Sequence, residues 1–532
     1  MTIFGFEWEV LNNSANTTPF EKILKNRGFS INDLKDETIH DPMLFQDMEK
    51  AVARIKHAIA QKERIMIFGD YDADGISGSA ILIRTLRQMG AEASCRIPHR
   101  EEDGYGLKMK FVDEFIQLGV KLVITVDCGI SCPSEVEKAQ DNGIDVIITD
   151  HHDIPLEPAK QAYAIIHPRY TDGYPFKHLS GSGVAYKLAS ALTEDAYKYL
   201  DLAAIGTIAD LVPLTGENRS IARRGLKQMA KTFWRGLNAL KNTANISEFD
   251  LKNMDGDMIG YRLAPRINAA GRIKSPYTAL HLLISDDSRV EELALELNDL
   301  NVQRQDLVKK IISEIEYDES EKIIFVIGDW QKGVLGLIAG KLSELTNKPV
   351  LAMMEKDGVL TGSARSPSYF DITGGLKKAD KLLKEYGGHK KAAGFGVEKK
   401  NFKKFKEVLL EQIAATEIPA KKLVLDCELT EEDLGLDLVA EIEKFKPFGE
   451  ENAHPKFLIK GVKIQEVKMV GSDSSHLKLI GSLGRKRISG IRFRAGQVAI
   501  PNGVVSIAGS LKKDSYASEG WGVMIEDLEI FY

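Results

Sequence analysis

The sequence predicts an α/β protein built from a parallel-sheet lobe, a long connector helix, a second α/β lobe and a C-terminal β barrel. Short apolar runs that alternate with helical stretches predict the parallel sheet. A stripe of leucine and isoleucine at helical spacing begins near residue 290 and predicts the connector, although it would also suit one face of a coiled coil. After about residue 420, short alternating segments predict a small barrel or sandwich.

The bulk composition is that of a globular protein with several domains. The chain has 532 residues, of which 43% are hydrophobic and 28% charged, and its net charge is −6. This balance argues against a uniformly basic nucleic-acid coat and leaves room for a local basic groove. None of the four cysteines forms a Cys-x-x-Cys pair, so neither a zinc knuckle nor a disulfide framework is supported. Without a signal peptide or a membrane-length apolar run, we expect a cytoplasmic protein.

Three carboxylates follow the first apolar run at alternate positions. Residues 65–69 are typical of a buried strand, and Asp70, Asp72 and Asp74 come directly after it, before a helical stretch. Open α/β sheets bind ligands at this edge. Crowded carboxylates repel one another, and Mg²⁺ or Mn²⁺ would relieve that repulsion. A solvated acidic turn is the alternative.

Two further strands are also followed by polar residues. Asp127 follows the run 122–126, and Asp150, His151 and His152 follow the run 146–149. A lone histidine usually makes a structural hydrogen bond, but two after an aspartate at a strand end favour metal ligation. We therefore expect Asp72, Asp74, Asp127 and His151 to lie together at one sheet edge.

Asp210 lies within an apolar helical run, 202–214, shortly before Pro213, where its charge needs a partner such as a metal ion.

Several basic residues lie in segments rich in small residues. Arg100 is in a loop, 97–107, and binds an anion or is a plain surface charge. Arg272 ends a predicted small-residue loop, 265–272, and Arg304 interrupts the connector stripe. In the second lobe, the predicted loop 362–366 pairs the Ser363 hydroxyl with the Arg365 guanidinium, which suits a phosphate. The glycines of 387–394 allow a ligand to approach the backbone, although either loop would also suit an ordinary turn.

A basic cluster with an aromatic residue lies in the predicted barrel. Its composition is typical of a surface for single-stranded nucleic acid, and the alternative is a solvated strand face. The cluster comprises Arg485, Lys486, Arg487, Arg492, Phe493 and Arg494.

Taken together, these motifs resemble the DHH phosphoesterase superfamily. The resemblance is carried by 70–75, 126–129, 150–152, Ala209-Asp210, 387–389 and 392–394, in that order. The connector and the C-terminal β domain make the set similar to the branch of 5′→3′ exonucleases specific for single-stranded DNA. The resemblance covers roughly residues 46 to 532. It implies four parts: a DHH catalytic domain (46–288), a connector helix (289–320), a DHHA1-like substrate-binding domain (321–418) and an OB-fold-like nucleic-acid-binding domain (419–532). The mixed N-terminal segment (1–45) is expected to pack on the first lobe.

The resemblance also implies roles for residues. It implies a two-metal centre with Mn²⁺ or Mg²⁺, formed by Asp70, Asp72, Asp74, Asp127, His151 and Asp210, with His152 beside it. Substrate contacts are expected from Arg100, Arg272, Ser363, Arg365, His389, Arg485, Arg487 and Arg492, and Arg100, Ser363 and Arg365 match positions that hold a 5′-terminal phosphate. One departure concerns Phe68: several smaller relatives have a ligating histidine there, and Asp70 would supply the missing contact.

The function expected from the resemblance is release of 5′-mononucleotides from single-stranded DNA during recombination and repair. A phosphodiesterase for short oligonucleotides or cyclic dinucleotides is the alternative, and a non-catalytic replication scaffold is a third possibility. The retained carboxylates argue against a scaffold, and the extra β domain favours the exonuclease. We expect a monomer that binds single-stranded DNA, no membrane association, and a single-stranded-DNA-binding protein and a helicase as partners.

Overall fold

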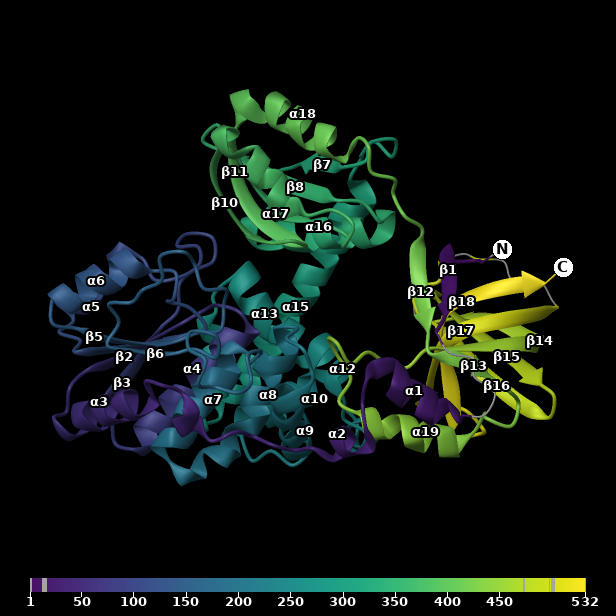
Figure 1. Cartoon of the computed structure of the whole chain (residues 1–532), viewed down its shortest axis with the longest axis horizontal. Helices are drawn as coiled ribbons and strands as arrows, with labels where there is room; N and C mark the ends of the chain where they lie inside the picture. Colours follow the sequence, from purple (N-terminus) through teal and green to yellow (C-terminus); the bar gives the residue numbers. More distant parts are fainter. Residues whose placement is uncertain (1, 12–16, 472–473, 497, 499–502, 532) are drawn as a thin grey trace. The chain divides into compact units, whose positions relative to one another are not determined.

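The computed structural model describes residues 2–11, 17–471, 474–496, 498 and 503–531. These residues form two compact units, Glu37–Ile418 and the combination of Met1–Asp36 with Pro419–Tyr532 (Figure 1). Within the described ranges, no helix is long and apolar enough to span a membrane.

The first lobe is built on a five-stranded parallel sheet in the order β3-β2-β4-β5-β6. Its central strands are buried on both faces, which explains their continuous apolar runs. The strands are β2 (Ile65–Gly69), β3 (Ala93–Arg96), β4 (Leu122–Val126), β5 (Asp145–Thr149) and β6 (Ala164–Ile166).

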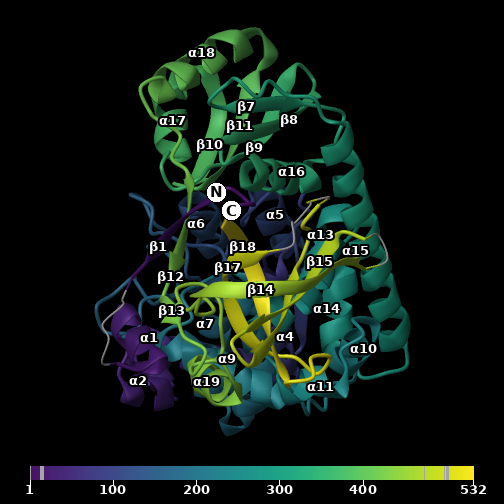
Figure 2. The same ribbon diagram turned by 90° about the vertical axis from the view of Figure 1, so that its right-hand side faces the viewer.

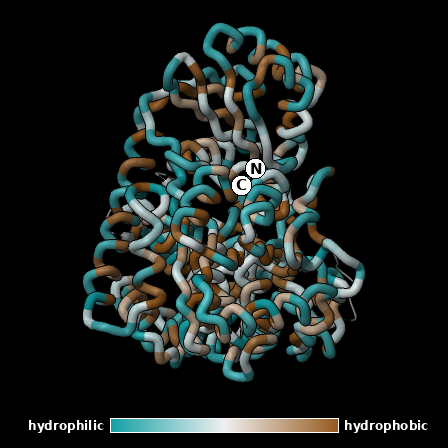
Figure 3. Tube along the Cα trace, turned by 90° about the vertical axis from the view of Figure 1, so that its left-hand side faces the viewer, coloured by the Kyte–Doolittle hydropathy of each residue, from teal (hydrophilic) through white to brown (hydrophobic). Residues whose placement is uncertain are grey.

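Helices cover both faces of this sheet. Met66 and Phe68 of β2 face α5 (Met109–Gln117) and α6 (Pro133–Asp141), and Phe68 packs against Phe111 at a ring-centroid distance of 5.2 Å. Ile65 and Ile67 face the other side, which is covered by α3 (Met48–Ala60), α4 (Ala73–Gln88) and α7 (Gly181–Leu192). In Figure 3, hydrophobic segments gather inside this lobe.

A helical layer continues the larger core of the first lobe and leads into the connector. The connector helix α15 spans Arg289–Glu314, within the predicted 289–320. The π-helix Ile259–Leu263 runs directly into α13 (Ala264–Ile273), so the stretch predicted as a small-residue loop is a helix instead. The other helices are α8 (Leu200–Ala209), α9 (Gly216–Met229), α10 (Arg235–Thr243), α11 (Glu248–Lys252), α12 (Gly256–Met258), α14 (Tyr277–Ile284) and the 3₁₀ turns Pro42–Leu44 and Glu194–Tyr199.

The second lobe has a mixed five-stranded sheet in the order β10-β11-β9-β8-β7. Helix α16 (Lys332–Thr346) packs on one face together with Ile311 of α15. Helices α17 (Ile372–Lys378) and α18 (Phe402–Ile413) pack on the other face. The strands are β7 (Ile324–Ile327), β8 (Val350–Lys356), β9 (Val359–Arg365), β10 (Leu383–His389) and β11 (Ala392–Glu398), with 3₁₀ turns at Asp380–Leu382 and Lys399–Asn401.

The C-terminal unit contains the predicted barrel. Its sheet runs β13-β14-β15-β16-β18-β17, and β17 also pairs with β14, which closes a five-stranded ring (Figure 2). Its elements are β12 (Lys421–Leu425), β13 (Cys427–Leu429), α19 (Leu436–Ile442), the 3₁₀ turn Glu443–Phe445, β14 (Phe457–Val470), β15 (His476–Leu483), β16 (Lys486–Arg492), β17 (Val504–Lys513) and β18 (Trp521–Phe531).

The N-terminal segment differs from the expectation that residues 1–45 pack on the first lobe. Strand β1 (Phe6–Val10) pairs in parallel with β12, and the buried Asp527 carboxylate accepts hydrogen bonds from the Phe4 amide and the Trp8 indole. Helices α1 (Pro19–Arg27) and α2 (Ile31–Lys35) belong to the same unit. The following residues do contact the first lobe, where the His40 amide donates to Glu217.

Candidate metal centre and substrate pocket

The acidic residues at the strand ends are held in a row by the sheet itself. The first amide after each strand continues the hydrogen-bonding ladder to the next strand: Asp70 N donates to Val126 O at 3.2 Å, and Asp127 N donates to Thr149 O at 2.9 Å. Asp150 N likewise donates to Ile166 O at 3.3 Å. The parallel register therefore fixes these three carboxylates side by side, as the sequence predicted for Asp127.

Asp72 and Asp74 are fixed by the ends of two helices. Asp72 caps α4 and accepts hydrogen bonds from the Asp74 and Gly75 amides. The buried Asp74 carboxylate accepts from the amides of Gly181 (2.6 Å) and Ser182 (2.9 Å) at the start of α7, where the helix dipole favours an anion. A Cβ at position 206 would lie 2.2 Å from Asp74 Oδ1, so a glycine is required on α8 at this point.

Asp127, His151 and Asp210 converge beside them. His151 Nε2 lies 3.1 Å from Asp127 Oδ1 and 3.5 Å from Asp210 Oδ2. Asp127 has a φ of +62°, a left-handed conformation that is uncommon outside glycine and that aspartate tolerates better than most residues. Such an outlier at a strand end points to a functional constraint on its carboxylate.

The predicted metal ligands thus form overlapping groups. One group comprises Asp70, Asp72 and Asp127, a second comprises Asp74, His151 and Asp210, and a third comprises Asp127, His151 and His152. Within each group the potential ligand atoms lie within 4.8 Å of one another.

Unpartnered atoms test whether these residues fit a metal. Among the described residues, Asp70 Oδ1, Asp127 Oδ1 and His151 Nε2 are buried and lack a hydrogen-bond partner. Buried polar atoms are rarely left in this state. A carboxylate-rich set with an imidazole suits Mn²⁺ or Mg²⁺, so the side chains present fit the predicted two-metal centre.

The pKa values of the acidic residues also indicate a metal site. Burial raises the pKa of Asp70 to about 8 and that of Asp74 to about 6, and in both cases the Asp72 carboxylate adds to the effect. Burial, followed by repulsion from Asp74 and Asp72, raises the pKa of Asp127 and of Asp210 well above the usual range. The cluster therefore resists full ionisation unless a cation neutralises it.

The sequence did not single out Asp150 as a site residue, but the structure gives it an orienting position. Its buried carboxylate accepts hydrogen bonds from the Ile130, His151 and His152 amides and lies 2.9 Å from His152 Nδ1. Burial lowers the pKa of His152, but the Asp150 contact outweighs it and raises that pKa to about 9. Burial, followed by repulsion from His152, lowers the pKa of His151 to about 3, which leaves its ring neutral and suited to ligation.

Two further residues support the centre without having been predicted. The Tyr105 hydroxyl donates to the Asp127 carbonyl oxygen at 3.1 Å and lies 3.1 Å from His152 Nδ1. Asn268 Oδ1 accepts from the Ala73 amide at 2.8 Å and so steadies the start of α4. The sequence offered no pattern that predicts either residue, apart from the glycine-rich stretch around Tyr105 and the small-residue stretch around Asn268.

A group of arginines from both lobes lies near the acidic loop. The Arg100 guanidinium stacks on the Tyr71 ring at 4.3 Å, and Arg272 donates to Gly333 O of α16 at 3.0 Å. Burial, followed by repulsion from Arg100 and Arg304, lowers the pKa of Arg272 to about 9. Burial and then Arg100 also lower the pKa of Arg365. The buried Nε atoms of Arg100 and Arg304 lack a hydrogen-bond partner in the described structure, so the group is suited to an anion.

Ser363 and Arg365 lie on strand β9 rather than in the predicted loop, because residues 359–365 alternate between buried and half-buried positions. Arg365 Nη1 donates to Ser363 Oγ at 3.0 Å. A Cβ at Gly336 of α16 would lie 2.9 Å from Arg365 Nη2, so the helix backbone forms one wall beside this guanidinium.

His389 lies at the end of β10, and its Nδ1 is 3.1 Å from Asp153 Oδ2, just beyond the histidine pair. The second lobe thus contacts the segment that follows the histidine pair, and the substrate contact of His389 stays a prediction.

The predicted basic cluster of the barrel is divided between the two ends of β16. Arg485 and Arg487 are exposed near the β15–β16 turn. Arg492 is paired with Glu526 at 3.2 Å and stacks over Phe4, and its role as a substrate contact stays a prediction.

Three family models match the chain: "DHH family, N-terminal domain" over residues 64–207, "DHHA1 domain" over 320–415 and "RecJ OB domain" over 425–527. The single-stranded-DNA-specific exonuclease RecJ of Bacillus subtilis is 37% identical over 94% of this chain and 66% of its own length. RecJ of Thermus thermophilus is 33% identical over 92% of this chain and 72% of its own. The chain therefore spans about two thirds to three quarters of the length of these relatives.

Solved structures agree with these relatives. The crystal structure of Thermus thermophilus RecJ with Mn²⁺ has a TM-score of 0.85 and 30% identity, covering 99% of this chain and 80% of that one. Its complex with Mg²⁺ has a TM-score of 0.79 and 29% identity, with coverages of 99% and 79%. From its sequence and its fold, the chain belongs to the RecJ family of DHH proteins.

Proposed function

We propose that this protein is a metal-dependent exonuclease that hydrolyses single-stranded DNA from its 5′ end and releases 5′-mononucleotides. The observation that carries the proposal is the pair of ligand groups that meet at Asp127 and His151, with an arginine group nearby. The RecJ relatives are named single-stranded-DNA-specific exonucleases, which supports single-stranded DNA as the substrate. The alternative, a phosphodiesterase for short oligonucleotides or cyclic dinucleotides, accounts less well for the attached barrel.

In this proposal, Asp70, Asp72 and Asp127 hold one Mn²⁺ or Mg²⁺ ion, and Asp74, His151 and Asp210 hold the other. Two such ions, when bound, activate water and neutralise the scissile phosphate and the leaving oxygen. Asp127 belongs to the first group and adjoins the second, since its Oδ1 lies 3.1 Å from His151 Nε2. Asp150 fixes the His152 ring through Nδ1, which leaves Nε2 to contact a phosphate oxygen.

The arginine group accounts for the polarity. Arg100, Arg272 and Arg365, with the Ser363 hydroxyl, would bind a 5′-terminal phosphate, which carries more charge than an internal diester. Anchoring that end sets which phosphodiester reaches the metal centre, so cleavage proceeds one nucleotide at a time. Arg485 and Arg487 of the barrel would contact the strand further along. A role in recombination and repair, a monomeric state, a cytoplasmic location, and a single-stranded-DNA-binding protein and a helicase as partners stay predictions.

The test is digestion of long single-stranded DNA labelled at its 5′ end, with Mn²⁺, with Mg²⁺ and with a chelator. We expect labelled mononucleotide as the first product and no cleavage with the chelator. The informative variant is Asp127→Asn, because asparagine tolerates the left-handed backbone at this position. It should bind DNA and cleave at least a hundredfold more slowly, whereas the exposed Asp141→Asn should behave as wild type. Long DNA left intact while dinucleotides are cleaved would support the alternative, and full activity of Asp127→Asn would refute the metal assignment.

A further inference from the structure

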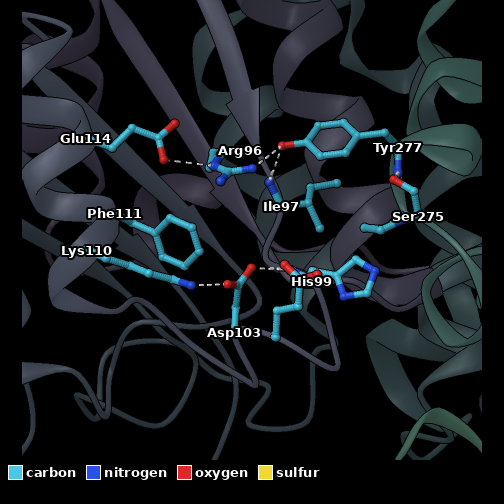
Figure 4. A pocket seen from close by; sticks show the side chains of 11 residues that line it. Arg96, Ile97, His99, Asp103, Lys110, Phe111, Glu114, Ser275 and Tyr277 are labelled. Carbon is cyan, nitrogen blue, oxygen red and sulfur yellow. Dashed lines mark hydrogen bonds and ion pairs between the residues drawn. The ribbon is translucent and has the colours of Figure 1, made fainter. Parts of the chain in front are cut away.

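A pocket of about 370 Å³ lies in the first lobe, behind the loop that carries Arg100 (Figure 4). It is lined by residues from β3, the following loop, α5 and the start of α14. Two pairs of its charged lining residues are joined: Arg96 lies 3.2 Å from Glu114, and Lys110 forms an ion pair with Asp103. Because these charges are already satisfied, the pocket is better suited to joining its walls than to binding a charged ligand.

Two side chains cross from one wall to the other. The Tyr277 hydroxyl accepts hydrogen bonds from the Ile97 amide at 3.0 Å and from Arg96 Nη1 at 3.3 Å. His99 Nε2 lies 2.7 Å from the Lys274 carbonyl oxygen, to which it donates. The turn after His99 is closed by its amide, which donates to Asp103 Oδ2 at 2.6 Å. Figure 4 shows Tyr277 and His99 on the two sides of this junction.

These bonds join the two segments that carry neighbouring arginines. Ile97 and His99 precede Arg100 by three residues and by one, and Lys274 and Tyr277 follow Arg272 by two and five residues. Both arginines also act electrostatically on Tyr71, whose ring stacks on Arg100. A Cβ at Gly271 would lie 2.8 Å from Tyr71 O, which shows how closely α13 approaches this residue. Arg100 acts on Arg272 as a like charge, so an anchor is needed to keep the two guanidiniums near each other when no anion lies between them.

We infer that Tyr277 and His99 are positioning residues for the 5′-phosphate pocket: they fasten the Arg100 loop to the segment that follows Arg272 and hold both guanidiniums ready for one phosphate. The inference rests on the proposed function, because it presumes that these arginines bind the 5′ end. Neither Tyr277 nor His99 touches the substrate in this arrangement. Preorganisation of this kind lowers the ordering cost of binding, so its loss should appear in KM more than in kcat.

The experiment measures kcat and KM of the full chain on single-stranded DNA with a 5′-phosphate and with a 5′-hydroxyl. Tyr277→Phe removes only the hydroxyl and should lower the preference for 5′-phosphate roughly threefold to tenfold, through KM, since it deletes hydrogen bonds of ordinary strength. Tyr199→Phe is the matched control, because its hydroxyl contacts Gln88 at the far end of α4. His99→Ala should behave like Tyr277→Phe, and His99→Gln should restore the preference, because its amide can donate to Lys274 O.

A double-mutant cycle separates this inference from the function on which it rests. Arg100→Ala should lower the preference at least tenfold, and adding Tyr277→Phe to it should lower the preference no further. If Arg100→Ala leaves the preference unchanged, the proposed pocket is wrong. If Arg100→Ala lowers it but Tyr277→Phe and His99→Ala do not, or if the two effects add fully, the positioning role is refuted. Should Tyr277→Phe fail to fold, the comparison of His99→Ala with His99→Gln decides the question alone.

Discussion

A single methyl group on α16 should weaken recognition of the 5′-phosphate while leaving the fold intact. In Gly336→Ala, the new Cβ would lie 2.9 Å from Arg365 Nη2 and 3.2 Å from Ser363 Oγ. Both distances are shorter than ordinary carbon contacts, and the guanidinium is the flexible partner. The substitution should therefore push Arg365 away from its place beside Ser363.

The size of the effect follows from the hydrogen bond to the phosphate that the displaced guanidinium no longer makes. A charge-assisted hydrogen bond contributes about 1.5–3 kcal/mol, so the 5′-phosphate preference in kcat/KM should fall roughly tenfold or more. Stability should change in the opposite direction, because alanine is favoured over glycine inside a helix by up to about 1 kcal/mol. A protein that is at least as stable as wild type but less selective would be difficult to explain by general damage.

Gly340→Ala supplies the matched control on the same helix. A Cβ there would lie 3.9 Å from Arg365 Cγ, which is an ordinary van der Waals distance. The assay is the ratio of kcat/KM for 5′-phosphorylated and 5′-hydroxyl single-stranded DNA, together with thermal unfolding of each variant. An unchanged ratio in Gly336→Ala, or an equal fall in Gly340→Ala, would refute the reasoning.

Three further predictions test other parts of the molecule. A chain of residues 37–418 should still cleave single-stranded DNA, but only at higher DNA concentrations than the full chain needs. Activity no greater than background would show that the barrel takes part in the chemistry. When the charges of Arg485 and Arg487 are reversed, the logarithm of the DNA-binding constant should depend less steeply on the logarithm of the salt concentration, by roughly 0.7 for each phosphate that the barrel no longer neutralises. An unchanged slope would mean that these side chains do not contact the DNA. Burial raises the pKa of Asp201 to about 6 from its ordinary 3.8, so the folded protein keeps a proton that the unfolded chain releases between these values. Stability should therefore fall by about 2 kcal/mol as the pH rises from 4 to 6, and Asp201→Asn should remove that part of the slope in denaturant titrations, whereas parallel curves for the two proteins would contradict it.

The strand ends could be predicted from sequence because periodicity and sheet geometry agree there. An apolar run followed by an acid is a local pattern, and parallel pairing places successive strand ends at one edge whatever the loops do. The register confirms this, since Gly69 pairs with Val126 and Val126 with Thr149. Asp127 and His151 were therefore predicted to lie together without any knowledge of the helices.

Other parts depended on interactions that no local pattern encodes. Arg304 only interrupted an apolar stripe, and its neighbour Arg272 comes from a separate helix. The small residues of 265–272 suggested a loop, but tertiary packing and the preceding π-helix make the segment helical. Arg492 pairs with Glu526 of β18, which follows 34 residues later in the chain. Pairings of this kind become visible only when the fold is known.

The pairing of β1 with β12 has a consequence for how the protein is made. Trp8 donates to a carboxylate 519 residues further along the chain, so the N-terminal strand lacks this contact until the barrel has been synthesised, and it lacks its pairing partner until β12 has been made. At ~5–20 residues per second, this delay amounts to roughly 25–100 s on the ribosome. During that time the Glu37–Ile418 unit can fold, but residues up to Asp36 remain an unpaired edge strand and two short helices. If synthesis stopped before the barrel, the released Glu37–Ile418 unit would carry an unpaired N-terminal segment that chaperones would bind.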